Sequence, residues 1–290
     1  MSARQRQSQR QSQRQRLRQG RLGRVLVYAV LVVLALFALG PLVTLVFDSL
    51  KTNAAIGASP LTPPSHPQLS NFATAWTQGD FSVTMRNSVV ICLGTMLGVC
   101  LIAGLAAYAL SQFDLPGGNG MIAYLFLGTA LPVQLFLVPL FFLWTRLHLT
   151  NNLLGLIIIF WATESPFATL LLRSYMLKIP REFLEAARLD GASELRSLFR
   201  VLLPLAWPGL MTIAVISGLF AWNEFFFSIT FIFQPALRPI ATSFLAFQDQ
   251  NSTNWGLTSA AALFMVVPAL LLFLGVQRRF VSGLTSGGLR

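Results

Sequence analysis

The chain has 290 residues, of which 54% are hydrophobic and only 11% are charged, whereas soluble domains carry roughly 25% charged residues. So little charge cannot cover the surface of a soluble protein of this length, and the composition therefore predicts a protein solvated by lipid. The formal net charge of +11 would suit a nucleic-acid-binding protein, but its distribution along the chain disfavours that class.

The first 24 residues form a strongly basic segment. Eight of the 21 basic residues lie in it, all of them arginines, and they alternate with Gln and Ser without apolar periodicity. Such a segment cannot bury enough surface to fold alone, so we expect residues 1–24 to be a disordered cytoplasmic tail that contacts anionic lipid headgroups. RNA binding by this tail is the weaker alternative, and we expect no nucleic-acid partner.

Six segments are long and apolar enough to cross a bilayer, which takes about 20 mostly apolar residues in a helix. They are residues 25–47, 88–110, 121–144, 153–172, 208–233 and 257–276. Because lipid offers the backbone no hydrogen-bond partners, each is expected to be helical. The sequence therefore predicts an all-α membrane protein with six transmembrane helices, kinked where proline falls within a span.

The distribution of Lys and Arg between the connecting segments predicts the orientation of the chain. With the N-terminus inside, the tail, residues 111–120, 173–207 and the C-terminal tail 277–290 hold seventeen basic residues, and the outside segments hold four. The positive-inside rule therefore places both termini in the cytoplasm. The external segment 48–87, which contains four prolines, is expected to be ordered but non-helical.

The cytoplasmic segment 173–207 is predicted to be a short helix–turn–helix at the membrane surface. Pro180 suits the first turn of a helix, Gly191 can end that helix in a left-handed conformation, and Ser193 can cap a second helix that runs to Pro204. The first helix carries an apolar stripe of Phe183, Leu184 and Ala187. This apolar face is too small to form a core, which indicates that the helix pair binds another protein.

The same segment resembles the EAA loop of ABC-importer permeases. The matching residues are Glu185, Ala186, Ala187, Gly191, Val201, Leu203 and Pro204, with Val201 in place of the usual isoleucine. In that family the loop is a coupling helix that docks into a cytoplasmic ATPase, which implies an ATPase-coupling role for Glu185, Ala186, Ala187, Gly191, Leu203 and Pro204. A local role is the alternative, in which Glu185 pairs with Arg181 or Arg188. We expect Gly191→Asp to abolish transport without blocking membrane insertion, because the turn should be crowded.

A wider resemblance runs from about residue 40 to the C-terminus. The motifs Asp48-Ser49-Leu50-Lys51-Thr52, Asn71-Phe72, Asn87-Ser88, Trp222-Asn223-Glu224-Phe225 and Gln277–Gly288 are similar to those of the carbohydrate-uptake branch, in particular the smaller permease of maltose-type systems. This implies the type I ABC-importer permease fold, a sugar or sugar derivative as cargo, and a location in the bacterial inner membrane. Loop 111–120 departs from the family pattern because it lacks the usual basic residue after its glycine.

The resemblance also implies partners. They are a homologous permease that forms a heterodimer with this chain, two copies of a cytoplasmic ABC ATPase, and an extracytoplasmic solute-binding protein that contacts residues 48–87 and 234–256. The sequence contains no G-x-x-x-x-G-K-[ST] phosphate loop and no metal-ligand spacing. We therefore expect no cofactor and no enzymatic activity in this chain, with ATP and Mg bound by the partner ATPase.

Two acidic residues fall within predicted spans, where a carboxylate is costly unless it faces protein or water. Glu164 is near the middle of the fourth span, and Glu224 follows Asn223 in the fifth. All three are candidates for the translocation pathway, where they would hydrogen-bond sugar hydroxyls. Interhelical hydrogen bonds that fix the bundle are the alternative.

Other functions are less well supported by the sequence. A polyol or a glycerol phosphate ester is an alternative cargo for the same kind of permease. A secondary transporter driven by an ion gradient should show inverted repeats and more embedded charges. A membrane-embedded hydrolase or transferase should show a nucleophile and a base, and no such pair is found.

Overall fold

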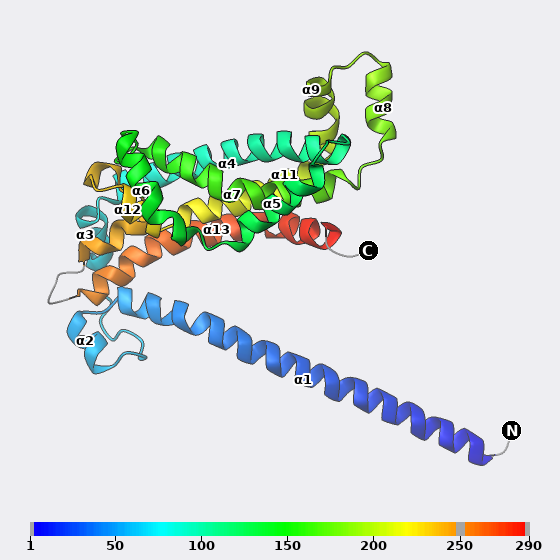
Figure 1. Ribbon diagram of the computed structural model, residues 1–290. Helices are drawn as coiled ribbons and strands as arrows, with labels where there is room; N and C mark the ends of the chain where they lie inside the picture. Colours follow the sequence, from blue (N-terminus) through cyan, green and yellow to red (C-terminus); the bar gives the residue numbers. More distant parts are fainter. Residues whose placement is uncertain (1–2, 248–252, 288–290) are drawn as a thin grey trace.

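The computed structural model describes residues 3–247 and 253–287, and all the regular elements within these ranges are helices. Four of them are long and apolar enough to cross a membrane: α1 (Ala3–Ser49), α4 (Phe81–Gln112), α7 (Leu153–Met176) and α13 (Trp255–Gly287). Two bent helix pairs, Gly118–Ala130 with Val133–Arg146 and Glu194–Leu205 with Trp207–Asn223, raise the number of candidate spans in the described residues to six if each pair is counted as one span. The all-α fold is therefore confirmed, and Figure 1 shows the long helices other than α1 as a bundle with short helices at both ends.

The third predicted span is bent rather than straight. Helix α5 (Gly118–Ala130) ends before Pro132, and the chain continues as a 3₁₀ turn, η1 (Val133–Phe136), and helix α6 (Leu137–Arg146) at 90° to α5. Leu131 is extended (φ −83°, ψ 131°), as proline requires of the residue before it, and Pro132 itself has no N–H to donate. The expected kink is thus confirmed here, whereas α7 and α13 continue through Pro166 and Pro268.

The fifth predicted span, 208–233, is wrong as a single helix. Helix α11 (Trp207–Asn223) ends at Glu224, and a short helix α12 (Phe226–Phe231) follows. No proline causes this break. The helix ends because the backbone of Glu224 is extended (φ −71°, ψ 117°). Two 3₁₀ helices, η3 (Pro235–Leu237) and η4 (Ile240–Phe247), then follow α12 in the chain.

The prediction that residues 48–87 are non-helical is also wrong. The segment contains α2 (Asn53–Ala58) and α3 (Ser70–Gln78), and α4 begins at Phe81. The four prolines all lie between α2 and α3, at Pro60, Pro63, Pro64 and Pro67, so they leave the flanking residues free to form helices.

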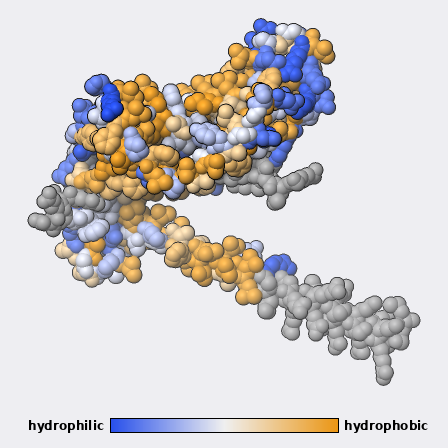
Figure 2. Space-filling view, in the orientation of Figure 1, coloured by the Kyte–Doolittle hydropathy of each residue, from blue (hydrophilic) through white to orange (hydrophobic). Residues whose placement is uncertain are grey.

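The structure extends both terminal helices through the predicted tails. Helix α1 begins at Ala3, so it includes residues for which the sequence predicts disorder, and α13 runs to Gly287. Arg and Gln favour helix, and α1 has no proline before Pro41. Helix α1 leans away from the bundle (Figure 1), and hydrophobic side chains line its C-terminal half (Figure 2). None of the residues in its most apolar window is buried within this chain.

The core lies where α4 packs against α7 and α11. Small residues of α4 let the backbones approach closely: a Cβ on Gly98 would come within 2.0 Å of the Trp161 ring. Trp161 Nε1 donates a hydrogen bond to the Gly94 carbonyl one turn away, at 2.8 Å. These contacts fix α7 against α4 along the middle of the bundle.

Candidate functional site

A helical arm projects from one end of the bundle (Figure 1). It consists of α8 (Glu182–Leu189), α9 (Glu194–Ser197), a π-helical turn η2 (Leu198–Leu202) and α10 (Leu203–Leu205). The N-terminal end of α1 and the C-terminal end of α13 lie at the same end of the molecule. The predicted helix–turn–helix in residues 173–207 is therefore confirmed.

Gly191 ends α8 as predicted, in the left-handed region at φ +77°. The Ala192 N–H donates to the Ala187 carbonyl and the Gly191 N–H to the Arg188 carbonyl, both at 3.0 Å, which together form a Schellman motif. A Cβ added to Gly191 would meet nothing within 4 Å. The expected crowding is therefore wrong within this chain, and the backbone conformation is what favours glycine here.

The second helix of the arm begins with a side-chain cap. Ser193 Oγ accepts a hydrogen bond from the Arg196 N–H at 3.4 Å, so the predicted capping role of Ser193 is confirmed. The cap fixes where α9 starts, two residues after the left-handed glycine, and so sets the angle between α8 and α9.

The arm is anchored to the bundle by buried leucines. Leu184 is 3% exposed and is the buried residue of α8, while Leu198 and Leu202 are fully buried. They belong to one cluster with Leu172 and Met176 of α7 and with small residues of α4. The predicted apolar stripe thus faces the bundle through Leu184, whereas Phe183 is 52% exposed.

A charged contact joins the two helices of the arm to α4. Arg188 Nε lies 2.9 Å from Glu194 Oε1, its Nη2 donates to Glu194 Oε2 at 3.2 Å, and the Tyr108 hydroxyl donates to the same carboxylate. These hydrogen bonds, from Arg188 first and then from Tyr108, lower the pKa of Glu194. Arg188 also lies 5.9 Å above the Phe113 ring. Arg188 therefore pairs with Glu194 across the turn, not with Glu185 as the local alternative supposed.

Sequence patterns did not reveal this contact. Arg188 and Glu194 are six residues apart on different helices, and Tyr108 is 86 residues away from Glu194. Helical i to i+4 spacing finds neither pair. The one available signal was the turn at Gly191, which folds α9 back beside α8.

The outer side of the arm is exposed and of mixed polarity. Glu185, Ala186 and Gly191 are exposed, and Leu189 and Leu195 present 89% and 62% of their surfaces. Hydrophobic patches interrupt the otherwise hydrophilic surface of the arm (Figure 2). The remaining predicted coupling residues are less accessible or lie further along: Ala187 and Leu203 are half-buried, and Pro204 is exposed in α10.

Glu164 lies half-buried on α7 and has no polar partner among the residues that the structure describes. Its side chain is half-buried on the face of α7 that carries Phe160 and Ala168, both buried. Among the described residues it makes no hydrogen bond and no ion pair. Its proposed interhelical hydrogen bond is therefore absent from the described residues, and its pathway role stays a prediction.

Glu224 has a local structural role that the sequence analysis did not foresee. Its Oε2 accepts hydrogen bonds from the N–H groups of Phe227 (2.9 Å) and Ser228 (3.1 Å), and so caps α12. The Ser228 hydroxyl donates to the Glu224 carbonyl at 2.8 Å. Asn223 is exposed and donates to the Leu219 carbonyl one turn back. Neither side chain bonds across to another long helix in the described structure.

In the described residues, no cluster of three or more His, Cys, Asp or Glu could hold a metal ion. What the arm offers instead is a protruding surface: an exposed outer side and an inner side tied to two long helices. That arrangement suits transmission of a movement from a bound protein to the membrane helices.

Residues 101–286 match the protein family described as binding-protein-dependent transport system inner membrane component. The chain is 36% identical over 250 residues to the probable ABC transporter permease YurM of Bacillus subtilis, which covers 86% of this chain and 83% of YurM. It is 33% identical over 268 residues to the sulfoquinovosyl glycerol transport system permease SmoH of Agrobacterium fabrum, covering 92% and 93%. It is 30% identical over 265 residues to the diacetylchitobiose uptake system permease NgcG of Streptomyces coelicolor, covering 91% and 88%.

Two solved structures share the fold. One is a chain of a bacterial ABC transporter involved in the import of the acidic polysaccharide alginate, with a TM-score of 0.77 at 23% identity over 90% of this chain and 97% of that chain. The other is the bacterial alginate transporter in complex with its alginate pentasaccharide-bound periplasmic protein, with a TM-score of 0.64 at 18% identity over 88% and 94%.

Proposed function

The chain belongs to the binding-protein-dependent transport system inner membrane components, the permease subunits of ABC importers, and from this premise we propose that its cargo is a sugar or sugar derivative. Its relatives SmoH and NgcG, which it matches over nine-tenths of its length, are named for sulfoquinovosyl glycerol and for diacetylchitobiose. Both cargoes are glycosides, and the motifs shared with the carbohydrate-uptake branch favour the same class here. A polyol or glycerol phosphate ester is the alternative cargo.

The arm is the proposed coupling site for a separate cytoplasmic ATPase. One observation carries this proposal: α8 exposes Glu185, Ala186 and Leu189 on its outer side, while Leu184 and the Arg188–Glu194 pair tie it to the bundle. A surface that is exposed on one side and anchored on the other can pass a rigid-body movement into α4 and α7. ATP binding would close the ATPase dimer, move the arm and open the permease cavity outward.

The same proposal sets the remaining partners and the orientation. The arm and the ends of α1 and α13 that share its side would face the cytoplasm, together with two ATPase copies that bind ATP and Mg. The exposed apolar surface of α1 supports a heterodimer with a homologous permease in the bilayer. The solute-binding protein named in the family description would contact the opposite, external end.

Copurification in mild detergent tests the coupling site. Wild-type permease should retain the ATPase, and Ala186→Asp should lose it, because the substitution places a charge on the exposed side of α8. Ala73→Asp is the matched control, an exposed helical alanine in α3 at the other end of the molecule. Equal retention by Ala186→Asp and the control would overturn the coupling site, and absence of any ATPase from the wild-type complex would favour a secondary transporter.

The cargo is tested on the partner that selects it. The purified solute-binding protein from the same complex should bind a sugar or glycoside in calorimetric titrations, and the sugar-loaded form should stimulate ATP hydrolysis by the reconstituted transporter. Binding of a polyol or a glycerol phosphate ester, with no sugar binding, would overturn the carbohydrate assignment while leaving the permease assignment intact.

A further inference from the structure

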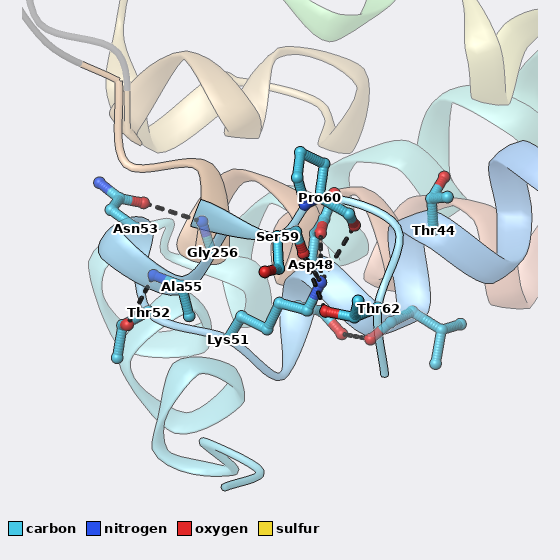
Figure 3. A network of polar contacts seen from close by, with 12 residues as sticks. Thr44, Asp48, Lys51, Thr52, Asn53, Ala55, Ser59, Pro60, Thr62 and Gly256 are labelled. Atoms are coloured by element: carbon cyan, nitrogen blue, oxygen red, sulfur yellow. Dashed lines mark hydrogen bonds and ion pairs between the residues drawn. The ribbon is translucent and has the colours of Figure 1, made fainter. Parts of the chain in front are cut away.

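The motif Asp48-Ser49-Leu50-Lys51-Thr52 has no part in the coupling site, yet it contains a buried lysine. Lys51 is 4% exposed, and its Nζ donates to the carbonyls of Ser59 and Pro60, both at 3.0 Å (Figure 3). Asp48 Oδ1 lies 3.6 Å from the same ammonium group. A buried charge is costly unless it is paired and hydrogen-bonded, so this arrangement strongly favours one backbone conformation at residues 59–60.

The lysine closes a compact external lobe, which we define as residues 53–68. The chain leaves Lys51, forms α2, and returns at Ser59 and Pro60 to the ammonium group before the Gln68 N–H donates to the Leu50 carbonyl at 2.9 Å. Residues 50–51 thus bind both the middle of the external lobe, at Ser59 and Pro60, and its C-terminal end, at Gln68. Without the ammonium group, the segment around Ser59 and Pro60 would lose both of these contacts.

A second set of hydrogen bonds fixes the external lobe against α13. Asn53 donates to the Thr253 carbonyl and accepts from the Gly256 N–H, both at 3.3 Å. Asn71 donates to the Lys51 carbonyl at 2.9 Å. A Cβ on Gly256 would lie 2.7 Å from that carbonyl oxygen, so α13 starts in direct contact with the lysine backbone. The external lobe is therefore oriented relative to the bundle as well as folded.

The surface of the external lobe is suited to protein contact. It has no Asp, Glu, Lys or Arg between Thr52 and Leu69, and it presents Leu61 with 77% of its surface exposed. A groove of about 590 Å³ runs along it between α2 and the proline-rich turn. Figure 1 places α2 at the end of the molecule opposite the arm, on the side where the proposed function puts the solute-binding protein.

We propose that Lys51 is a positioning residue that preorganises the external lobe as a docking surface for the solute-binding protein. This inference rests on the proposed function, which supplies the partner. A docking surface that is already ordered before the partner binds loses less conformational entropy on binding, so its affinity for the partner is higher. The absence of charge on the external lobe and the exposed Leu61 suit an apolar contact that forms and breaks in each transport cycle.

The test uses the complete transporter in lipid nanodiscs and titrates the solute-loaded binding protein while ATP hydrolysis is measured. Lys51→Met should raise the half-saturating concentration of binding protein at least tenfold and leave basal hydrolysis unchanged, and amide exchange in residues 53–68 should accelerate. Thr44→Ala is the control, because Thr44 lies on α1 outside the external lobe and its hydroxyl donates to the Pro41 carbonyl of the same helix. The double variant Asp48→Asn/Lys51→Met leaves no unpaired buried charge and should behave like Lys51→Met, so a folding defect of the single variant does not hide the effect.

The outcomes separate this inference from the proposed function. Faster exchange in the external lobe with an unchanged half-saturating concentration would overturn the docking role while the permease assignment stands. Loss of the homologous permease from the complex of the double variant would also overturn it, because the external lobe would then hold that partner. Failure of the binding protein to stimulate the wild-type transporter would instead overturn the proposed function.

Discussion

Leu184→Ala tests whether the arm transmits force as a rigid body. Leu184 is 3% exposed and anchors α8 in the cluster that contains Leu172 and Met176. Truncating a buried leucine to alanine costs about 2–5 kcal/mol, through lost apolar burial and the cavity left behind. With about 2.7 kcal/mol lost from the docking of α8, local opening of the arm should be roughly 100-fold more frequent.

Leu189 provides the matched control, because it has the same side chain on the same helix but is 89% exposed. In the isolated permease, Leu184→Ala should speed amide exchange across α8 and α9 by about two orders of magnitude, and Leu189→Ala should leave it unchanged. In the reconstituted transporter, Leu184→Ala should keep the ATPase bound but lower the number of solute molecules carried per ATP. Leu189→Ala should weaken ATPase retention, since this side chain lies on the proposed docking side.

Two results would refute this reasoning. If Leu184→Ala left exchange in α8 unchanged, the buried leucine would not be what holds the arm. If exchange rose as expected but transport per ATP stayed at the wild-type value, a rigid anchor would not be needed for coupling.

Three further predictions concern single contacts. The Gly191→Asp variant should insert into the membrane normally but lose solute uptake. Gly191→Asn, which is uncharged and tolerates φ +77°, should keep most of the uptake. Equal loss of uptake in both variants would show that side-chain size, not charge, causes the effect. A double-mutant cycle with Arg188→Gln and Glu194→Gln should give about 0.5–1 kcal/mol of coupling by amide exchange of α8, reduced by salt because both side chains are exposed by more than 40%. Since Arg188 lowers the pKa of Glu194, that coupling should be present at neutral pH and vanish as the pH falls through this lowered pKa. Glu224→Ala should cost about 1 kcal/mol of local stability in α12, seen as faster exchange there, whereas slower uptake by Glu224→Gln with normal exchange would point to the pathway instead.

The elements that sequence analysis located correctly are those set by local chemistry. Apolar length located the four straight spans and the bent third one, and Gly191 and Ser193 marked the turn between α8 and α9 because a left-handed glycine and a capping serine act on their immediate neighbours. The break at Glu224 was missed because nothing in its flanking residues forbids helix. The break depends on the Glu224 side chain, which accepts hydrogen bonds from the first N–H groups of α12. That conformation competes with a continuous helix only in the packed structure.

Glu164 and Glu224, the two carboxylates within predicted spans, differ in their contacts, and the sequence could not show this difference for a similar reason. A carboxylate within an apolar span needs a partner, and the sequence identified Glu164 and Glu224 as such groups without showing what each would meet. Glu224 finds its partners three and four residues further along its own chain, whereas Glu164 has none among the described residues. Glu164 is half-buried and has no partner in the described residues, so it stays a candidate for the translocation pathway.

Helix α4 connects the two functional ends of the molecule. At one end its Tyr108 holds Glu194 of the arm, and at the other its Asn87 donates to the carbonyls of Ala236 (2.9 Å) and Arg238 (3.1 Å), in η3 and directly after it. Twenty-one residues separate Asn87 from Tyr108 within one uninterrupted helix, which is about 30 Å of rigid backbone. The Asn87-Ser88 motif therefore has a structural role, because it binds residues 236–240 to the same helix that contacts the arm. If the arm is the coupling site, its displacement would pass along α4 to the opposite end of the bundle without crossing the breaks that interrupt the third and fifth spans.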